Sequence, residues 1–341
     1  MEKVQVFIVG AGPSRLAMTA CLSKLSIPYT IAEREDCIVS LWHKHTYDCL
    51  QLHIPKEYME DYVKHLNISP KFNTSAESCM YGEVRKCWVV MTHNKVDVPI
   101  MYASKFLVLA TSENVVGYVP EIVGLQSFPS ETIHSSSYKS GNDYVGKSVL
   151  IVGCGNSGLE IAHDLVLHGA NTSIIIGSPL HGLTLVIVKL HVMTKELIHV
   201  GMVLSTWHLP LKLVDFILMI LAYQKTGRSA IIDTGTTELI KNGDIKVFGP
   251  ISCIQGNIVE FADGNERYYY AIVFATGYKS TTNMWLKYCD DIPRNDFPNH
   301  WKGANGLYCI GFGRRGLAGI VHDANIVARD IHANMEMAYF N

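Results

Sequence analysis

The chain has 341 residues, 48% of them hydrophobic, and a formal net charge of -2. This length allows one large or two medium α/β domains with their own cores. The near-neutral charge gives no field that would attract nucleic acid. The start, MEKVQVFIVG, runs directly into a strand-like segment without a secretory signal. We therefore expect a cytoplasmic protein that keeps its thiols reduced and does not bind nucleic acid.

The cysteines and the apolar stretches narrow the remaining classes. Nine cysteines are scattered along the chain, and none forms a C-x-x-C pair, which argues against a dithiol redox centre and against a bound metal. The most apolar stretch, LVDFILMILAY at residues 213–223, is shorter than the ~20 residues that span a bilayer. We expect a buried helix there and no spanning segment. Peripheral attachment to a membrane such as the endoplasmic reticulum stays open.

The N-terminal residues predict a βαβ unit that binds a dinucleotide. The apolar run VQVFIV at residues 4–9 is typical of a buried parallel strand. A helix is expected over residues 16–25 and a second strand over residues 29–32. The sequence GAGPSR at residues 10–15 connects the first strand to the helix. This order of elements is the dinucleotide-binding fingerprint.

The residues of this first turn have separate expected roles. Gly10 permits the tight turn, and Gly12 lets the backbone approach a pyrophosphate at the helix N-terminus. Glu33 follows the second strand and is placed to accept hydrogen bonds from ribose hydroxyls. Arg15 stands where the pattern has its third glycine, at the closest approach of helix and strand. Its side chain must therefore swing out or push these elements apart.

The same arrangement occurs a second time in the middle of the chain. A strand over residues 148–152 leads into GCGNSG at residues 153–158, followed by a helix over 157–168 and a strand over 172–176. This copy has all three glycines, and two full units are much less expected by chance than one. Its expected nucleotide contacts are Gly153, Gly155, Asn156, Ser157 and Gly158.

The ribose position of the second copy lacks an acid. Its second strand ends in Gly177 and Ser178. A missing acid disfavours NAD because nothing there pairs with a free 2′-hydroxyl, whereas NADP would favour an arginine that is also missing. Because NAD is disfavoured, NADP(H) is the expected nucleotide, although no arginine is present to bind its 2′-phosphate. Ser178 could donate one hydrogen bond there.

Two further segments, FLVLATS at residues 106–112 and IVFATGY at residues 272–278, are near copies of each other. Each is a buried strand that ends in a turn of small residues, and one follows each glycine turn. Such turns let the chain leave the sheet close to a bound nucleotide. Thr111 is therefore predicted near the first nucleotide, and Thr276 and Gly277 near the second.

Longer motifs carry a resemblance to a known family. GAGPSRLA and GCGNSGLE look like its FAD and NADPH motifs, and FPSETIHSSSY at residues 128–138 is similar to its signature FxGxxxHxxxY, with Ser130 in place of glycine. SLWHKHTYD, HSSSYKSG, FATGYKS, HWKGANGLY and GFGRRGLAGI are more specific matches. Together they resemble class B flavin-dependent monooxygenases, and within them the plant YUCCA group, over nearly the whole chain.

The resemblance implies a fold and a reaction. The fold is α/β with two Rossmann-like domains: an FAD domain of residues 1–141 and 279–341, and an inserted NADP(H) domain of residues 142–278. Residues 139–143 form the expected linker. In the implied reaction NADPH reduces FAD, and the reduced flavin takes up O2 as a C4a-peroxyflavin. This species converts the 2-oxo acid indole-3-pyruvate to indole-3-acetate, the auxin. No metal is required.

The resemblance also assigns site residues. In the signature between the domains, Phe128, His134 and Tyr138 would contact cofactor or couple the domains, while a structural hydrogen-bonding role for His134 is an equal alternative. Core packing is the alternative for Trp42, and a solvated basic pair is the alternative for Arg314 and Arg315. The implied FAD contacts are Gly10, Gly12, Ser14, Arg15, Glu33, Trp42, Thr111 and Arg315.

Several departures from the family keep other hypotheses open. Arg15 replaces a glycine, Ser112 replaces the glycine of the first ATG turn, and Cys49 stands where the family usually has arginine. Segments after residues 52–57 and 221–223 look short. The second hypothesis is therefore a degenerate, non-catalytic relative with a binding or regulatory role, or a truncated gene product. A flavin disulfide reductase is disfavoured because no redox cysteine pair is present.

Overall fold

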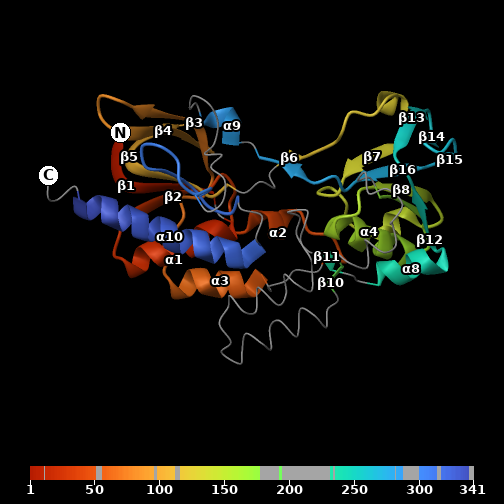
Figure 1. Cartoon of the computed structure of the whole chain (residues 1–341), viewed down its shortest axis with the longest axis horizontal. Helices are drawn as coiled ribbons and strands as arrows, with labels where there is room; N and C mark the ends of the chain where they lie inside the picture. Colours follow the sequence, from red (N-terminus) through yellow and green to blue (C-terminus); the bar gives the residue numbers. More distant parts are fainter. Residues whose placement is uncertain are drawn as a thin grey trace. The chain divides into compact units, whose positions relative to one another are not determined.

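The chain forms two compact units (Figure 1). The first contains Met1–His45, Leu52–Val116 and Tyr278–Asn341, and the second contains Thr46–Gln51 and Gly117–Gly277. The computed structural model describes residues 1–10, 12–50, 56–95, 98–111, 116–176, 192–193, 231–232, 235–280, 282–286, 299–312 and 316–337.

The first unit is built on a mixed six-stranded sheet in the order β2-β1-β5-β4-β3, with β18 beside the end of β5. The long strand β5 pairs with the antiparallel β4 through its first half and with the parallel β18 through its last residues. The carboxyl ends of the parallel strands therefore meet at one edge. The strands are β1 (Glu2–Val9), β2 (Tyr29–Ala32), β3 (Thr74–Gly82), β4 (Cys87–Asn94), β5 (Pro99–Leu109) and β18 (Leu307–Cys309).

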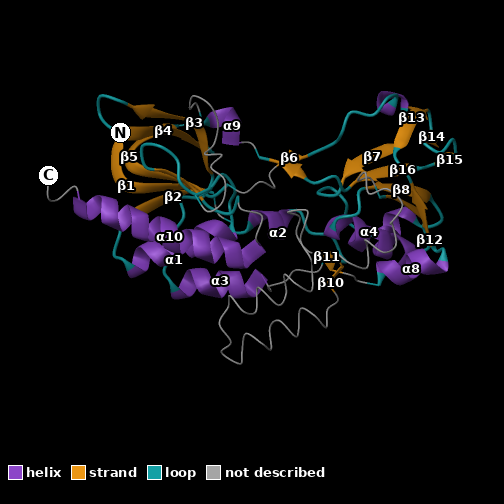
Figure 2. Ribbon diagram, in the orientation of Figure 1, coloured by secondary structure: helices purple, strands orange, loops and turns teal. Residues whose placement is uncertain are grey.

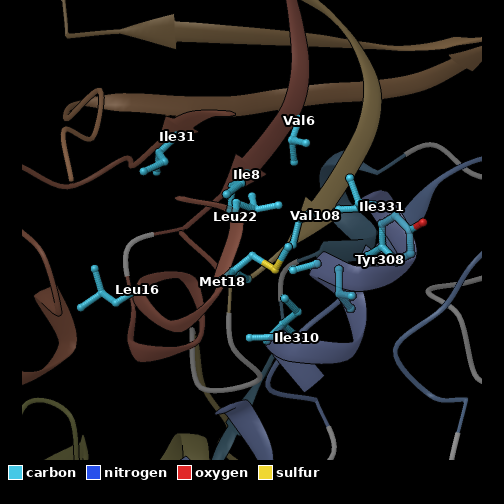
Figure 3. Packing of buried hydrophobic residues seen from close by; sticks show 14 of the residues in the cluster. Val6, Ile8, Leu16, Met18, Leu22, Ile31, Val108, Tyr308, Ile310 and Ile331 are labelled. Atoms are coloured by element: carbon cyan, nitrogen blue, oxygen red, sulfur yellow. The ribbon is translucent and has the colours of Figure 1, made fainter. Parts of the chain in front are cut away.

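Helices cover one face of this sheet (Figure 2). Successive side chains of β1 point to opposite faces of the sheet and so belong to two separate cores. Val6 and Ile8 face α1 and α10, whereas Phe7 and Val9 pack on the other face with Trp88. Figure 3 shows the helix-side core, in which apolar side chains from α1 and α10 meet those of the strands. The helices on this face are α1 (Pro13–Lys24), α2 (Ser40–Lys44), α3 (Lys56–His65) and α10 (Gly316–Met337). The short helix α9 (Thr282–Trp285) instead contributes Trp285 to the core on the other face.

The second unit contains a five-stranded sheet in the order β12-β9-β8-β16-β7, and all its pairs are parallel. A three-stranded antiparallel sheet, β13-β14-β15, contributes Val259 and Phe261 to the core on one face, while α4 contributes Leu159 to the core on the other. The sheet strands are β7 (Glu131–His134), β8 (Ser148–Val152), β9 (Asn171–Ile175), β12 (Ile245–Phe248) and β16 (Ala271–Phe274).

The remaining elements that the structure describes in the second unit are short. The helices are α4 (Asn156–Leu167), α8 (Thr236–Asn242) and the 3-10 turns η1 (Leu125–Ser127) and η2 (Gly141–Tyr144); the other strands are β10 (Val192–Met193), β11 (Ile231–Ile232), β13 (Ile251–Gln255), β14 (Ile258–Phe261) and β15 (Glu266–Tyr268). The chain passes between the units near β6 (Val116–Gly117) and β17 (Tyr278–Lys279).

One predicted domain boundary differs from the structure. The boundary at residues 141/142 falls inside the second unit, because β7 already pairs with β16 in the second sheet. Residues 139–143 are likewise not a free linker, since the Gly141 amide donates to the buried Asp164 carboxylate at 2.7 Å. The later division between the two units falls at residues 277/278.

The predicted apolar helix at residues 213–223 lies outside the described residues. Within the ranges given above, none of the helices combines the length and the apolar character that crossing a bilayer requires.

Candidate functional site

The two glycine turns are structural copies of each other. Gly10 and Gly153 have φ of +112° and +111°, in the region that L side chains rarely adopt. A Cβ on either would lie 2.5 Å from a carbonyl oxygen, that of Ala110 or that of Ala275. Both turns therefore need glycine, and each lies against the small-residue turn that ends the neighbouring strand.

The N-termini of the two helices that follow these turns are open. Gly12 and Gly155 are N-caps with ψ of -177° in both, and a Cβ on either would meet no described atom within 4 Å. Neither α1 nor α4 has a side-chain cap among the described residues. The free N–H groups and the positive dipole end of each helix thus face accessible space, which fits a dinucleotide pyrophosphate at each turn.

The third position of the motif differs between the copies. A Cβ on Gly158 would lie 2.2 Å from the Gly153 carbonyl oxygen. The first copy carries Arg15 there, with 0% exposure. The arginine therefore does not swing out, which corrects one of the two expected outcomes.

Arg15 is a buried cation without a partner among the described residues. All three of its guanidinium nitrogens lack a hydrogen bond to any described residue. Burial lowers the pKa of Arg15 to about 9, and the nearby Glu33 carboxylate only partly offsets this. Among the described residues, the guanidinium lies more than 4 Å from a Cβ built on Gly12. The cost of Arg15 therefore falls on packing and charge.

Glu33 lies at the end of β2, where the ribose acid was predicted. It is 5% exposed and accepts a hydrogen bond from the Glu35 amide at 3.0 Å. Burial raises the pKa of this carboxyl group, and the Glu35 amide and Arg15 oppose the shift.

Other predicted FAD residues lie beside the same turn. Ser14 is buried, and its Oγ would be 2.2 Å from a Cβ on Gly311, which explains the glycine after β18. Thr111 Oγ1 lies 3.0 Å from Thr282 Oγ1. Thr282 Oγ1 in turn lies 2.8 Å from Ser280 Oγ. Three hydroxyl groups therefore gather at the end of β5, next to the Gly10 turn.

Two predicted FAD residues have a different status. Trp42 is half-buried and packs against the helix-side core of the first unit, which agrees with the core-packing alternative. Arg315 and its neighbour Arg314 lie outside the described residues, as does Ser112.

In the second unit, the predicted nucleotide residues converge at the ends of β8 and β16. Asn156 and Ser157 are the first residues of α4. The Thr276 hydroxyl donates to the Tyr118 carbonyl. Gly277 has φ of +82°, and its carbonyl accepts from the Tyr118 amide at 2.9 Å. Ser178 and Gly177 lie outside the described residues.

His134 is held in one tautomer. The Ser136 amide donates to Nδ1 at 3.2 Å, so Nδ1 carries no proton. Nε2 must then donate to the Gly277 carbonyl oxygen at 2.9 Å. A Cβ on Gly117 would lie 2.4 Å from His134 Nδ1. The structural role considered for His134 is therefore present.

The other two signature residues are also packed. Phe128 is 8% exposed and lies in the core of the second unit. Tyr138 is fully buried and donates to Asp164 Oδ2 at 2.6 Å. The signature thus ties the chain before β8 to the sheet and to α4.

We expect stability to depend on pH through His134. Burial lowers the pKa of His134 below its ordinary value of 6.5, so the unfolded chain binds a proton that the folded state resists. The free energy of unfolding should therefore fall as the pH drops below about 6.5. Urea unfolding between pH 5 and 8 measures this slope. His134→Gln keeps an N–H donor without titrating and should flatten it; equal slopes would contradict the prediction.

Sequence reasoning missed some of these residues. Ser280 and Thr282 were not predicted as site residues, although Ser280 stands in the FATGYKS match. Tyr47, in the SLWHKHTYD match, donates to Glu160 Oε2 at 2.5 Å across 113 positions of sequence. The motif matches were signals for Ser280 and Tyr47, but no local pattern links Tyr47 to α4.

Two Rossmann-like units, each with a glycine turn at the start of a helix, define the class of two-dinucleotide oxidoreductases. A family profile described as "Pyridine nucleotide-disulphide oxidoreductase" matches residues 49–195. "Probable indole-3-pyruvate monooxygenase YUCCA10" of Arabidopsis thaliana is 40% identical over 387 residues, covering 98% of each chain. "Indole-3-pyruvate monooxygenase YUCCA1" of Oryza sativa subsp. japonica is 36% identical, covering 95% of this chain and 90% of the relative. The chain belongs to the YUCCA family of flavin-dependent monooxygenases.

Solved structures agree with this fold. A flavin-containing monooxygenase from Stenotrophomonas maltophilia has a TM-score of 0.73 at 17% identity, covering 98% of this chain and all of the other. The OTEMO complex with FAD and NADP has a TM-score of 0.67 at 14% identity, covering 98% of this chain and 86% of the other. The alignment with the first Arabidopsis relative spans 387 positions, more than the 341 residues here, so parts of that relative have no counterpart. This agrees with the expected shortening.

Proposed function

We propose that the chain binds FAD at the first glycine turn and NADP(H) at the second. With O2, it would oxidatively decarboxylate indole-3-pyruvate to indole-3-acetate. The observation that carries the proposal is the pair of matching open turns, Gly10 to Gly12 and Gly153 to Gly155. The names of the family relatives support the substrate, and the complex of FAD and NADP on the same fold supports the cofactors.

Each turn has a defined task in this proposal. The amides at the start of α1 would hold the FAD pyrophosphate, and Glu33 would accept hydrogen bonds from its ribose. The amides at the start of α4, with Ser157, would hold the NADP(H) pyrophosphate. Bound FAD would supply the redox chemistry by taking a hydride from NADPH and passing oxygen from O2 to the substrate. The protein's part is to bind, orient and exclude water.

Arg15 favours the second candidate function, a relative that no longer catalyses. A buried guanidinium without a described partner, beside the FAD turn, destabilises the element that would hold the flavin. Such a chain would retain the fold and the NADP(H) turn while binding FAD poorly.

The visible spectrum of the purified protein separates the two candidates. We expect a flavin band after incubation with FAD, bleaching of the band by NADPH without air, and formation of indole-3-acetate from indole-3-pyruvate when air is admitted. Chromatography of the product checks the last step. Protein that stays colourless with excess FAD would refute the oxygenase. A flavin band that NADPH bleaches, without product, would refute only the substrate.

A further inference from the structure

The short segment Thr46–Gln51 belongs to the second unit, although residues of the first unit flank it on both sides in sequence. Hydrogen bonds to Lys139 hold it in place: the Asp48 amide donates to the Lys139 carbonyl at 3.0 Å, and Lys139 Nζ donates to the Thr46 carbonyl at 3.2 Å. The segment thereby brings Tyr47 and Cys49 against α4.

The phenol of Tyr47 lies against the start of α4. Its Oη donates to Glu160 Oε2 at 2.5 Å, and the Ser157 side chain is near enough to oppose the rise in the pKa of Tyr47. Tyr47 and Glu160 are both buried. Burial and the Glu160 carboxylate hold the pKa of Tyr47 well above its usual range, so the phenol remains a donor at neutral pH.

The surroundings of Tyr47 fix its ring. It packs edge-on against Tyr138, with centroids 6.0 Å apart and an interplanar angle of 72°. Cys49 Sγ lies 3.5 Å from the Glu160 carbonyl oxygen. Burial, with the nearby Asp164 and Glu160 carboxylates, raises the pKa of the Cys49 thiol to about 12. The thiol therefore stays neutral and adds no charge.

The start of α4 needs such a support. Its N-cap, Gly155, provides no side-chain hydrogen bond to the first turn, and helix ends without a cap are less stable. Yet the amides of this turn are those that face the open space at Gly155. A tyrosine that donates to Glu160 restrains the start of the helix from the side, without occupying the space next to Gly155.

We propose that Tyr47 is a positioning residue for the NADP(H) pyrophosphate: its hydrogen bond to Glu160 fixes the start of α4 in the geometry that binds phosphate. The inference rests on the proposed function of this turn. Tyr47 itself does not touch the cofactor. Its removal loosens the amides that do, so the effect is on nucleotide affinity.

Calorimetric titration of the full-length protein with NADP+ tests the inference. Tyr47→Phe removes only the hydroxyl group and keeps the ring packing. We expect the Kd for NADP+ to rise about five- to tenfold, which corresponds to one lost hydrogen bond, while the Kd for FAD stays unchanged. If the wild-type protein does not bind NADP+, the proposed function fails. If the wild type binds and the variant binds equally well, the inference alone fails.

Tyr144→Phe is the matched control. Tyr144 is buried in the same aromatic group, stacked on Tyr138 at 6.0 Å, and the acid that acts on its phenol is Glu131 of β7. Both variants lower the free energy of unfolding, but only Tyr47→Phe should weaken NADP+ binding; parallel weakening in both would overturn the inference. If Tyr47→Phe does not fold, Glu160→Gln and Glu160→Ala replace it. Glu160→Gln keeps an oxygen that can accept from Tyr47 and should keep the Kd for NADP+. Glu160→Ala removes this acceptor and should raise the Kd. Equal Kd values for the two variants would overturn the inference.

Discussion

Arg15→Gly should make the protein more stable. The substitution removes a fully buried guanidinium with no described partner. A buried charge whose desolvation is only partly offset, and which makes no hydrogen bond, costs about 3–5 kcal/mol, whereas a glycine inside a helix costs about 1 kcal/mol. We therefore expect the free energy of unfolding to rise by about 2–4 kcal/mol, measured by urea denaturation at neutral pH.

Lys24→Gly is the control for Arg15→Gly. Lys24 is exposed in the last turn of the same helix, so it also loses one positive charge and gains one glycine. It should lower the free energy of unfolding by about 1 kcal/mol or less. The pKa of Arg15 falls from 12.5 to about 9. The cost is therefore fully present below pH 9 and declines only above it, so the gain should be constant from pH 6 to 8. A loss equal to that of Lys24→Gly would contradict the prediction.

The substitution Arg15→Gly should also change the affinity for FAD. With glycine at position 15, α1 can approach its strand as α4 does at Gly158, and the helix start can approach the phosphates more closely. We expect Arg15→Gly to bind FAD more tightly than the parent, by fluorescence titration. An unchanged Kd for FAD would confine the effect of Arg15 to stability and count against the non-catalytic alternative.

Gly158→Ala should weaken NADP+ binding at least tenfold. The added Cβ would lie 2.2 Å from the Gly153 carbonyl oxygen and 3.3 Å from the Ala275 Cβ. Helix and turn must separate, and overpacking of this kind costs about 1–3 kcal/mol. A loss of ~1.4 kcal/mol in binding is tenfold in Kd. Calorimetry with NADP+ provides the measurement, and FAD binding should not change.

Gly249→Ala is the control for the alanine itself. A Cβ on Gly249, in the same unit, would meet no described atom within 4 Å. This variant should keep the parent's Kd for NADP+ and its stability. If Gly158→Ala matched it, the second glycine turn would not be the site of NADP(H).

The sequence predicted the local strands and the glycine turns well. The strands over residues 29–32 and 148–152 match β2 and β8. Both turns have the geometry that their glycines require, because a positive φ at a strand end is a local property. The side chain of Arg15 was less predictable. Its position follows from the motif, but its burial depends on residues that are distant in sequence, such as Tyr29 and Glu33.

Long-range features were the ones missed. The first boundary was placed at 141/142 because residues 139–143 are polar and contain glycine, which is typical of linkers. The amide of Gly141 instead satisfies Asp164, and β7 joins the second sheet. The position of Tyr47 had no local signal, since its partner Glu160 is 113 residues away. Contacts of that separation depend on the folded topology and not on periodicity.

The placement of Thr46–Gln51 has a consequence for protein engineering. A fragment that contains only residues 117–277 would lack Tyr47, whose phenol donates a hydrogen bond to Glu160 of α4. Transplanting those residues into a relative would likewise pair α4 with whatever side chain the recipient carries at that place. Residues 117–277 therefore do not contain the whole second unit, and a chimera that carries them also needs residues Thr46–Gln51 from the same protein.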